Sequence, residues 1–249
     1  MLDILRLGDF DWETLHHDQG NASDLPVIFR EFFSASSDEG AARAVGSLAE
    51  RVCYAGEEVV EATAPAVRVM WRIAGVEDFE WRHFAIQFVD AVAAVDGLFY
   101  RRLEGGKIID SCRKAIEDGL HIPWSLINDS NVNLRGSSIE ILGDAAPSDA
   151  IVPFLLKILR EESDPILRAD ASAALVSSLI RSEREGEAEE ARKFAERFLL
   201  EGDSLVRLKV AQLLAVTCPS WIIESDLDSI INSAYREVVE TGLYRSEYA

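Results

Sequence analysis

Pro153-Phe-Leu-Leu-Lys-Ile-Leu159 and, after a short break, Asp164-Pro-Ile-Leu-Arg168 are the two stretches that decide the fold. The first places apolar side chains along a helix, and the segment from Glu161 to Pro165 interrupts it. Asp164 is typical of a helix N-cap, because its carboxylate can accept a backbone N–H. Pro165 suits the first helical turn, where a missing N–H does no harm. The region therefore predicts two helices joined by a tight corner.

The opening of the second helix, an acidic or amide residue followed four positions later by arginine, recurs along the chain. The copies run from Asp78 to Arg82, Asn131 to Arg135, Asp164 to Arg168 and Asp203 to Arg207, with a looser version from Asp38 to Arg43. Successive arginines are 33 to 39 residues apart, apart from one interval of 53, and such lengths accommodate two helices with their turns. One hairpin cannot bury so wide an apolar face, so the units should stack on one another.

The periodicity predicts paired helices and a final capping helix. We expect them near 24–35 and 39–54, 63–75 and 78–96, 106–118 and 131–144, 148–161 and 165–181, 188–201 and 204–217, with the cap near 224–241. The predicted fold is all-α, a right-handed α–α superhelix (solenoid) of about five helical hairpins plus the cap. Residues 1–249 are expected to form a single domain, with an N-terminal segment 1–22, repeats 23–217 and a C-terminal cap 218–249. The segment 97–130 is irregular, and its role stays open.

Composition limits the classes of function. The formal net charge is −19, from 44 acidic and 25 basic side chains, so a nucleic-acid backbone would be repelled while a basic protein would be attracted. The same acidity also favours solubility. The chain begins without a secretory pattern and has no apolar stretch of about 18 residues, which predicts a cytoplasmic protein that does not enter a membrane.

No pattern in the chain predicts catalysis, a metal or a cofactor. Cys53, Cys112 and Cys218 are far apart, so neither a zinc site nor a disulfide framework is expected. Adjacent helical side chains point about 100° apart, so His16 and His17 would make a poor chelate. Motifs for a serine nucleophile or a phosphate loop are absent. The aromatic residues around Trp81 are more typical of a core than of a nucleobase platform.

The repeated pattern resembles the HEAT and HEAT-like repeat family. It consists of an acidic or amide residue, the arginine that follows it, and then a small residue and a leucine at helical spacing. Residues 23–43 and 56–67 resemble a bacterial HEAT-repeat group, some of whose members are associated with toxin systems. The resemblance spans residues 23–217 and implies an architecture more than an activity. It also implies that the repeat arginines pair between adjacent hairpins and fix their register. These are Arg43, Arg82, Arg135, Arg168 and Arg207.

Acidic residues gather around the predicted inter-helix corners and second-helix starts. If the hairpins stack in register, these corners should form an extended acidic strip that contacts a partner. The candidate partner-binding residues are Glu77, Asp78, Glu80, Trp124, Asp129, Glu162, Asp164 and Asp170.

The preferred interpretation is a non-enzymatic repeat protein that binds a basic protein. By the resemblance, it would be an immunity protein or antitoxin that covers a toxin. One alternative is a HEAT-like enzyme or lyase that handles a small molecule in a pocket near His121, Trp124 and Asp129. Another is an assembly scaffold with several protein partners. The sequence leaves all three open.

Overall fold

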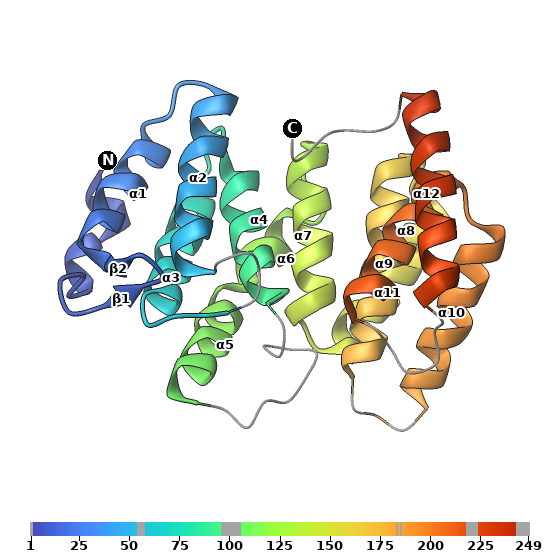
Figure 1. Ribbon diagram of the computed structural model, residues 1–249. Helices are drawn as coiled ribbons and strands as arrows, with labels where there is room; N and C mark the ends of the chain where they lie inside the picture. The colour runs from blue at the N-terminus through green and yellow to red at the C-terminus, as the bar shows by residue number, and fades with distance from the viewer. Residues whose placement is uncertain are drawn as a thin grey trace. The chain divides into compact units, whose positions relative to one another are not determined.

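The computed structural model describes residues 2–53, 58–95, 106–182, 184, 186–217 and 224–242, and it is all-α, as predicted (Figure 1). The described helices are α1 (Leu25–Phe33), α2 (Asp38–Val52), α3 (Thr63–Ala74), α4 (Arg82–Ala93), α5 (Lys107–Gly119), α6 (His121–Leu126), α7 (Val132–Ala145), α8 (Ser148–Glu161), α9 (Pro165–Arg181), α10 (Glu187–Glu201), α11 (Ser204–Thr217) and α12 (Glu224–Thr241). None of them is long and apolar enough to cross a membrane.

The N-terminal segment is built from short pieces. Two 3-10 helices, η1 (Leu2–Leu5) and η2 (Leu7–Asp9), precede a two-stranded antiparallel pair, β1 (His16–His17) and β2 (Gly20–Asn21). A third 3-10 helix, η3 (Ala22–Asp24), leads into α1.

The predicted helices match the observed ones closely, with two differences. The helix predicted from 78 begins only at Arg82, because residues 77–81 form turns in which Phe79 packs against Phe32 at a ring-centroid distance of 5.3 Å. Helix α6 was not predicted. Helix α2 ends at Val52 and α4 at Ala93, before the predicted ends at 54 and 96, which themselves lie outside the described residues.

The chain divides into two compact units, unit 1 (residues 1–141) and unit 2 (residues 142–249), with the boundary inside α7. The single domain and the right-handed superhelix stay predictions.

Unit 1 contains the hairpins α1–α2 and α3–α4, and α5 packs on α3. Its largest fully buried side chains include Phe29, Phe32, Met70, Ile86 and Phe88. Helix α3 is buried along most of its length, because α4 and α5 both pack on it. Burying apolar surface of this kind is the main stabilising term in such a unit.

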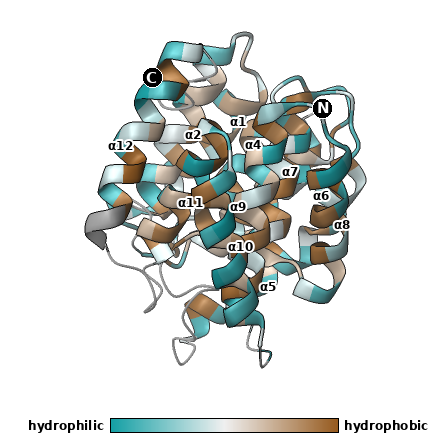
Figure 2. Cartoon of the chain, turned by 90° about the vertical axis from the view of Figure 1, so that its right-hand side faces the viewer, coloured by the Kyte–Doolittle hydropathy of each residue, from teal (hydrophilic) through white to brown (hydrophobic). Residues whose placement is uncertain are grey.

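Unit 2 contains the hairpins α8–α9 and α10–α11, and α12 packs on α11. Helix α9 contacts α8, α10 and α11, so side chains on almost every face of it are buried. Figure 2 shows apolar and polar bands alternating around α10, α11 and α12, as expected of helices that bury one face. A Cβ on Gly143 would lie 2.5 Å from the Cβ of Ala174, so a small residue is needed where α7 meets α9.

In three of its copies, the first residue of the repeated motif caps the helix that follows. The side-chain oxygens of Asn131, Asp164 and Asp203 accept backbone N–H groups in the first turns of α7, α9 and α11. The N-cap predicted at Asp164 is therefore present. Asp78 does not cap α4, and Ser37 rather than Asp38 caps α2.

The arginines of the motif contact several kinds of partner. The Arg168 guanidinium pairs with Asp203 of the next hairpin at 3.3 Å, and Arg207 pairs with Glu237 of α12. Arg135 donates to the carbonyl of Asp129 in its own corner. In two further cases the contacts stay within a helix or a hairpin, since Arg43 pairs with Glu39 one turn earlier and Arg82 donates to the Ala74 carbonyl at the end of α3. Pairing between successive hairpins is thus observed in unit 2, and at Arg43 and Arg82 the contacts are local instead.

Candidate functional site

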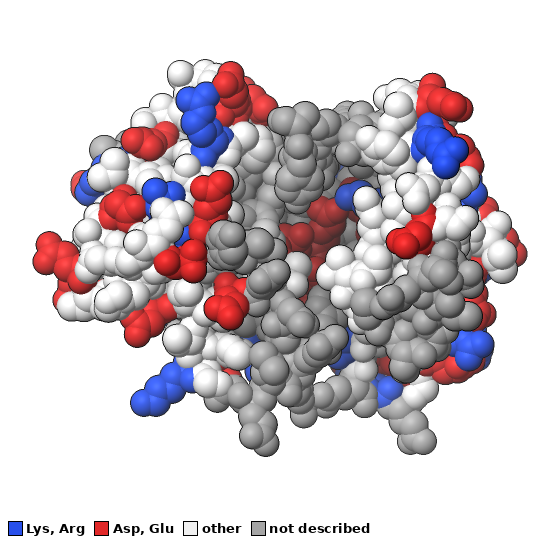
Figure 3. Space-filling model, viewed as in Figure 1, with Lys and Arg blue, Asp and Glu red and all other residues white. Residues whose placement is uncertain are grey.

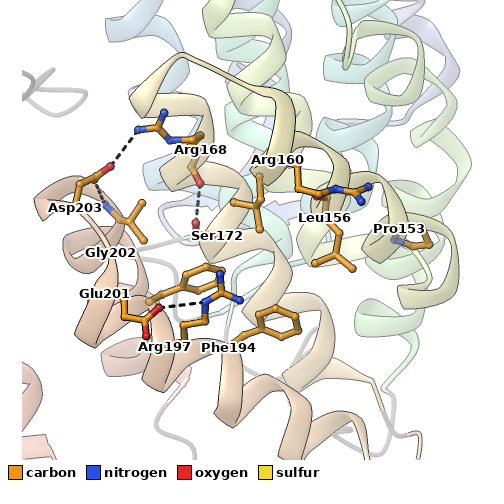
Figure 4. Close-up of a pocket in the computed structure, with 13 residues that line it drawn as sticks. Pro153, Leu156, Arg160, Arg168, Ser172, Phe194, Arg197, Glu201, Gly202 and Asp203 are labelled. Atoms are coloured by element: carbon orange, nitrogen blue, oxygen red, sulfur yellow. Dashed lines mark hydrogen bonds and ion pairs between the residues drawn. The ribbon is translucent and has the colours of Figure 1, made fainter.

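Unit 2 has an open groove between α8 and α10. Both helices pack against α9 but hardly against each other, and the space between them has a volume of about 840 Å³ (Figure 4). The groove is lined by Pro153, Leu156, Leu159 and Arg160 of α8, Arg168 and Ser172 of α9, Phe194, Arg197, Phe198 and Glu201 of α10, and Gly202, Asp203 and Val206 at the start of the last hairpin helix.

The floor of the groove is apolar. Leu156 lies on the α8 side, and Phe194 and Phe198 lie one turn apart on the α10 side. The two phenylalanine rings stack with centroids 6.0 Å apart and planes 27° apart. These three side chains are only half-buried, so apolar surface is left open to an incoming group.

The rim of the groove carries three arginines. Figure 4 shows Arg168 joined to Asp203, and Arg197 joined to Glu201 by an ion pair of 3.5 Å in which both side chains are about two-thirds exposed. Arg160 is exposed, and its Nε donates to the Leu156 carbonyl at 3.2 Å. Among the described residues, no carboxylate pairs with Arg160. The rim can therefore offer a guanidinium to a carboxylate from outside.

The corner between α10 and α11, at one end of the groove, is closely packed. Asp203 uses one carboxylate oxygen to cap α11 and the other to hold Arg168. A Cβ on Gly202 would lie 2.4 Å from the Phe198 carbonyl oxygen, so the chain can make this close turn only with glycine. The shape of this end of the groove is therefore fixed by the fold.

In unit 1, the predicted partner-binding residues lie in two separate corners. Glu77, Asp78 and Glu80 are exposed in the turn between α3 and α4, and within the described residues none of them makes an ion pair. Asp129 lies before α7, where its carboxylate accepts the backbone N–H of Asn131. Trp124 is half-buried on α6.

In unit 2, three predicted residues have structural partners. Glu162 accepts the backbone N–H groups of Ser163 and Asp164, and Asp164 caps α9. Asp170 corrects the prediction, because it is 4% exposed and its carboxylate pairs with Lys209 of α11 at 3.2 Å. It is a buried inter-helix contact and does not lie on an acidic surface. The continuous acidic strip that the sequence predicts would include residues of both units, and it stays a prediction.

On the face shown in Figure 3, acidic side chains outnumber basic ones over both units. On this face the excess of negative charge is thus spread over the described residues, whereas the groove in unit 2 gathers arginines. Sequence reasoning missed this groove. The alternation of Phe194, Arg197, Phe198 and Glu201 in one helix was the available signal, but it reads equally well as a half-buried helix face.

The cysteines and histidines have structural surroundings. Burial raises the pKa of the Cys53 thiol to about 11 and that of Cys112 to about 12, which disfavours the reactive thiolate. Cys218 lies outside the described residues. His17 is buried and bonded to Asp24 at 2.9 Å, while the exposed His16 contacts Glu61 at 3.1 Å. In the described part of the chain, no three metal-ligating side chains come together.

Comparison with family models, with curated proteins and with solved structures found no match to this chain.

Proposed function

We propose that this protein is a helical-hairpin protein that binds another protein, and that the groove of unit 2 receives an amphipathic helix of that partner. The proposal rests on one observation. The groove between α8 and α10 leaves half-buried apolar side chains next to an arginine that has no carboxylate partner among the described residues.

The spacing of the groove residues fits a helical occupant. Phe194 and Phe198 are four residues apart on α10, and Leu156 lies opposite them on α8, so they form an apolar channel between two helices. Helix-in-groove recognition uses such channels to take apolar anchors three or four residues apart on the bound helix. A carboxylate beside those anchors would meet Arg160 and gain a charge-assisted hydrogen bond.

The net charge of the whole chain also limits the kind of protein that can be the partner. A net charge of −19 favours encounter with a protein that is basic overall, even though its docking segment carries a carboxylate. In its most specific form, which only the family resemblance suggests, the partner is a basic toxin and this protein is its immunity protein. The exposed corner at Glu77, Asp78 and Glu80 would then assist the approach.

The direct test uses labelled peptides that form amphipathic helices, in which leucine and phenylalanine anchors are flanked either by glutamate or by lysine. Fluorescence anisotropy should show that the glutamate peptide binds better. Leu156→Asp should abolish binding, and Arg160→Gln should weaken it about three- to tenfold. Arg192→Gln is the matched control, because Arg192 is exposed on α10, pairs with Glu196 and does not line the groove.

The same variants can then be used with products of neighbouring genes, measured by co-purification and calorimetry. Loss of binding in Leu156→Asp but not in Arg192→Gln would support the groove. Loss only on lysine substitution at Glu77, Asp78 and Glu80 would move the interface to the acidic corner and reject the groove. Inhibition of a basic partner's activity would separate an immunity protein from a scaffold.

A further inference from the structure

Unit 1 has a second cavity, of about 690 Å³, at the end of α3 where α5, α6 and η1 meet it. The helices that form it can be followed in Figure 1. Trp71 and Ile122 contribute apolar surface, and four arginines line the same space, Arg6, Arg68, Arg72 and Arg82. This collection of guanidinium groups is unexpected in so acidic a chain.

Arg82 is the most buried of the four arginines. Its residue is 9% exposed, and its Nε donates to the Ala74 carbonyl at 2.8 Å. Among the described residues, no carboxylate forms an ion pair with it. Burying a charge without a counter-ion destabilises the fold. An anion in the cavity would supply the missing counter-ion and so reduce this destabilisation.

The other three arginines are also under-neutralised. Arg6 and Arg72 share a single carboxylate, that of Asp9, at 3.1 and 2.8 Å. Arg68 is half-buried and makes no ion pair with any described residue.

Two acidic residues also line the cavity, so four arginines face two carboxylates. Asp118 pairs with Lys114 at 3.1 Å, and Glu77 makes no ion pair with any described residue. The lining therefore keeps an excess of positive charge.

We propose that this cavity binds a small organic anion, with a phosphate or carboxylate group held by Arg68 and Arg82 and an apolar part against Trp71 and Ile122. The volume lies in the range of about 300–1,000 Å³ that is usual for small-molecule sites. The Trp71 wall is fixed, because its indole N–H donates to the Ala115 carbonyl at 3.1 Å. His121 also lines the cavity, whereas Trp124 and Asp129 do not.

This site is independent of the protein-binding groove, because every residue of the cavity belongs to unit 1 and every residue of the groove belongs to unit 2. The proposed small-molecule pocket is therefore lined by arginines of α3 and α4, and not by Trp124 and Asp129 as the sequence suggested.

Titration calorimetry on the full chain at constant ionic strength tests the proposal with three probes. Phenyl phosphate and benzoate carry the two kinds of anion on the same ring, and benzyl alcohol is the neutral analogue. We expect at least one anion to bind and benzyl alcohol to bind at least tenfold more weakly. The stronger of the two anions tells whether the site prefers phosphate or carboxylate.

Arg68→Gln should weaken binding of the anion about tenfold, because it removes a charge-assisted hydrogen bond without emptying the core. Arg43→Gln is the matched control, since Arg43 is exposed on α2 and, among the described residues, pairs with Glu39 alone. Arg160→Gln should leave anion binding intact, which separates this site from the groove. Absence of binding by both anions, equal binding of benzyl alcohol, or an unchanged affinity in Arg68→Gln would overturn the proposal.

Discussion

His83 lies buried on α4, 8% exposed, with its ring 4.2 Å from that of Phe84 between centroids. Its Nδ1 is buried and has no hydrogen-bond partner within the described structure. Burial lowers the pKa of His83 below its ordinary value of 6.5, and the nearby Asp38 offsets this only in part. The folded protein therefore favours the neutral form of this histidine.

The sign of the resulting pH dependence follows from linkage. Well above pH 6.5 the histidine is neutral in both states, and as the pH falls the unfolded chain takes up the proton first. The free energy of unfolding should thus fall as the pH drops below about 6.5. Urea unfolding at pH 7.5 and 5.5 measures this loss, and His83→Phe should reduce it. His121→Gln, which changes an exposed histidine, should not; an equal effect of both substitutions would contradict the argument.

Asp24 should contribute a separate loss at lower pH. Burial alone would raise the pKa of Asp24, but the hydrogen bonds from Arg51 and His17 outweigh it, so the pKa lies below its ordinary value of 3.8. A carboxyl of this kind adds stability that is lost only as the pH falls below that value. The loss from Asp24 therefore begins at a lower pH than the loss from His83.

Gly119, at the end of α5, lies directly against the Trp71 ring of α3. A Cβ at this position would lie 2.2 Å from Cδ1 and Nε1 of Trp71, whose ring is held in the core. We expect Gly119→Ala to lower the free energy of unfolding by about 1–3 kcal/mol, because the core must move to make room. Gly46→Ala is the matched control. It lies inside α2 in open space, so it should stabilise by about 0.5–1 kcal/mol. Similar effects of the two substitutions in urea unfolding would refute the clash.

At the scale of helices, Asp164 and Asp203 act as N-caps. Replacing Asp164 by alanine should cost about 1 kcal/mol of unfolding free energy, because two N–H groups at the start of α9 lose their acceptor. Asp164→Asn should restore most of it. Asp203→Ala should cost more than Asp164→Ala, since it also removes the ion pair with Arg168. Thermal or urea unfolding of the three variants ranks them, and a larger loss at Asp164 would contradict this ranking.

These caps also explain why most helices could be predicted. A cap residue, an apolar repeat and a breaker are all local, so they are visible in the sequence at α7, α9 and α11. Helix α6 was missed because Gly119 and Pro123 suggest a break. In the structure, Trp71 packs on Gly119 and a proline is tolerated in the first turn. The deciding contact joins residues far apart in the chain.

The candidate sites were harder to predict for the same reason. Exposure of Glu77, Asp78 and Glu80 followed from their place in a corner. The burial of Asp170 depends on Lys209, which comes from a different hairpin. The groove depends on α8 and α10 failing to pack together, and the unit 1 cavity depends on arginines from three segments. No periodicity in one segment carries such information.

At the scale of the whole molecule, charge should govern how a partner arrives and the groove should govern how long it stays. With a net charge of −19, the attraction of a basic protein is long-ranged at low salt and is screened beyond about 8 Å at physiological salt. The association rate should therefore fall about tenfold or more between low and high salt. Lysine substitution at Glu77, Asp78 and Glu80 should lower that rate and weaken its salt dependence.

Arg160→Gln should act differently, because a contact inside the groove forms only after the encounter. We expect it to raise the dissociation rate and to change the association rate little, as is usual for short-range contacts. Stopped-flow measurements with the basic partner at two salt concentrations separate the two rates. If Arg160→Gln slowed association as much as the lysine substitutions did, Arg160 would act through long-range electrostatic interaction during the encounter rather than through a contact in the bound complex. The groove would then lose its assigned role, although the anion cavity in unit 1 would not.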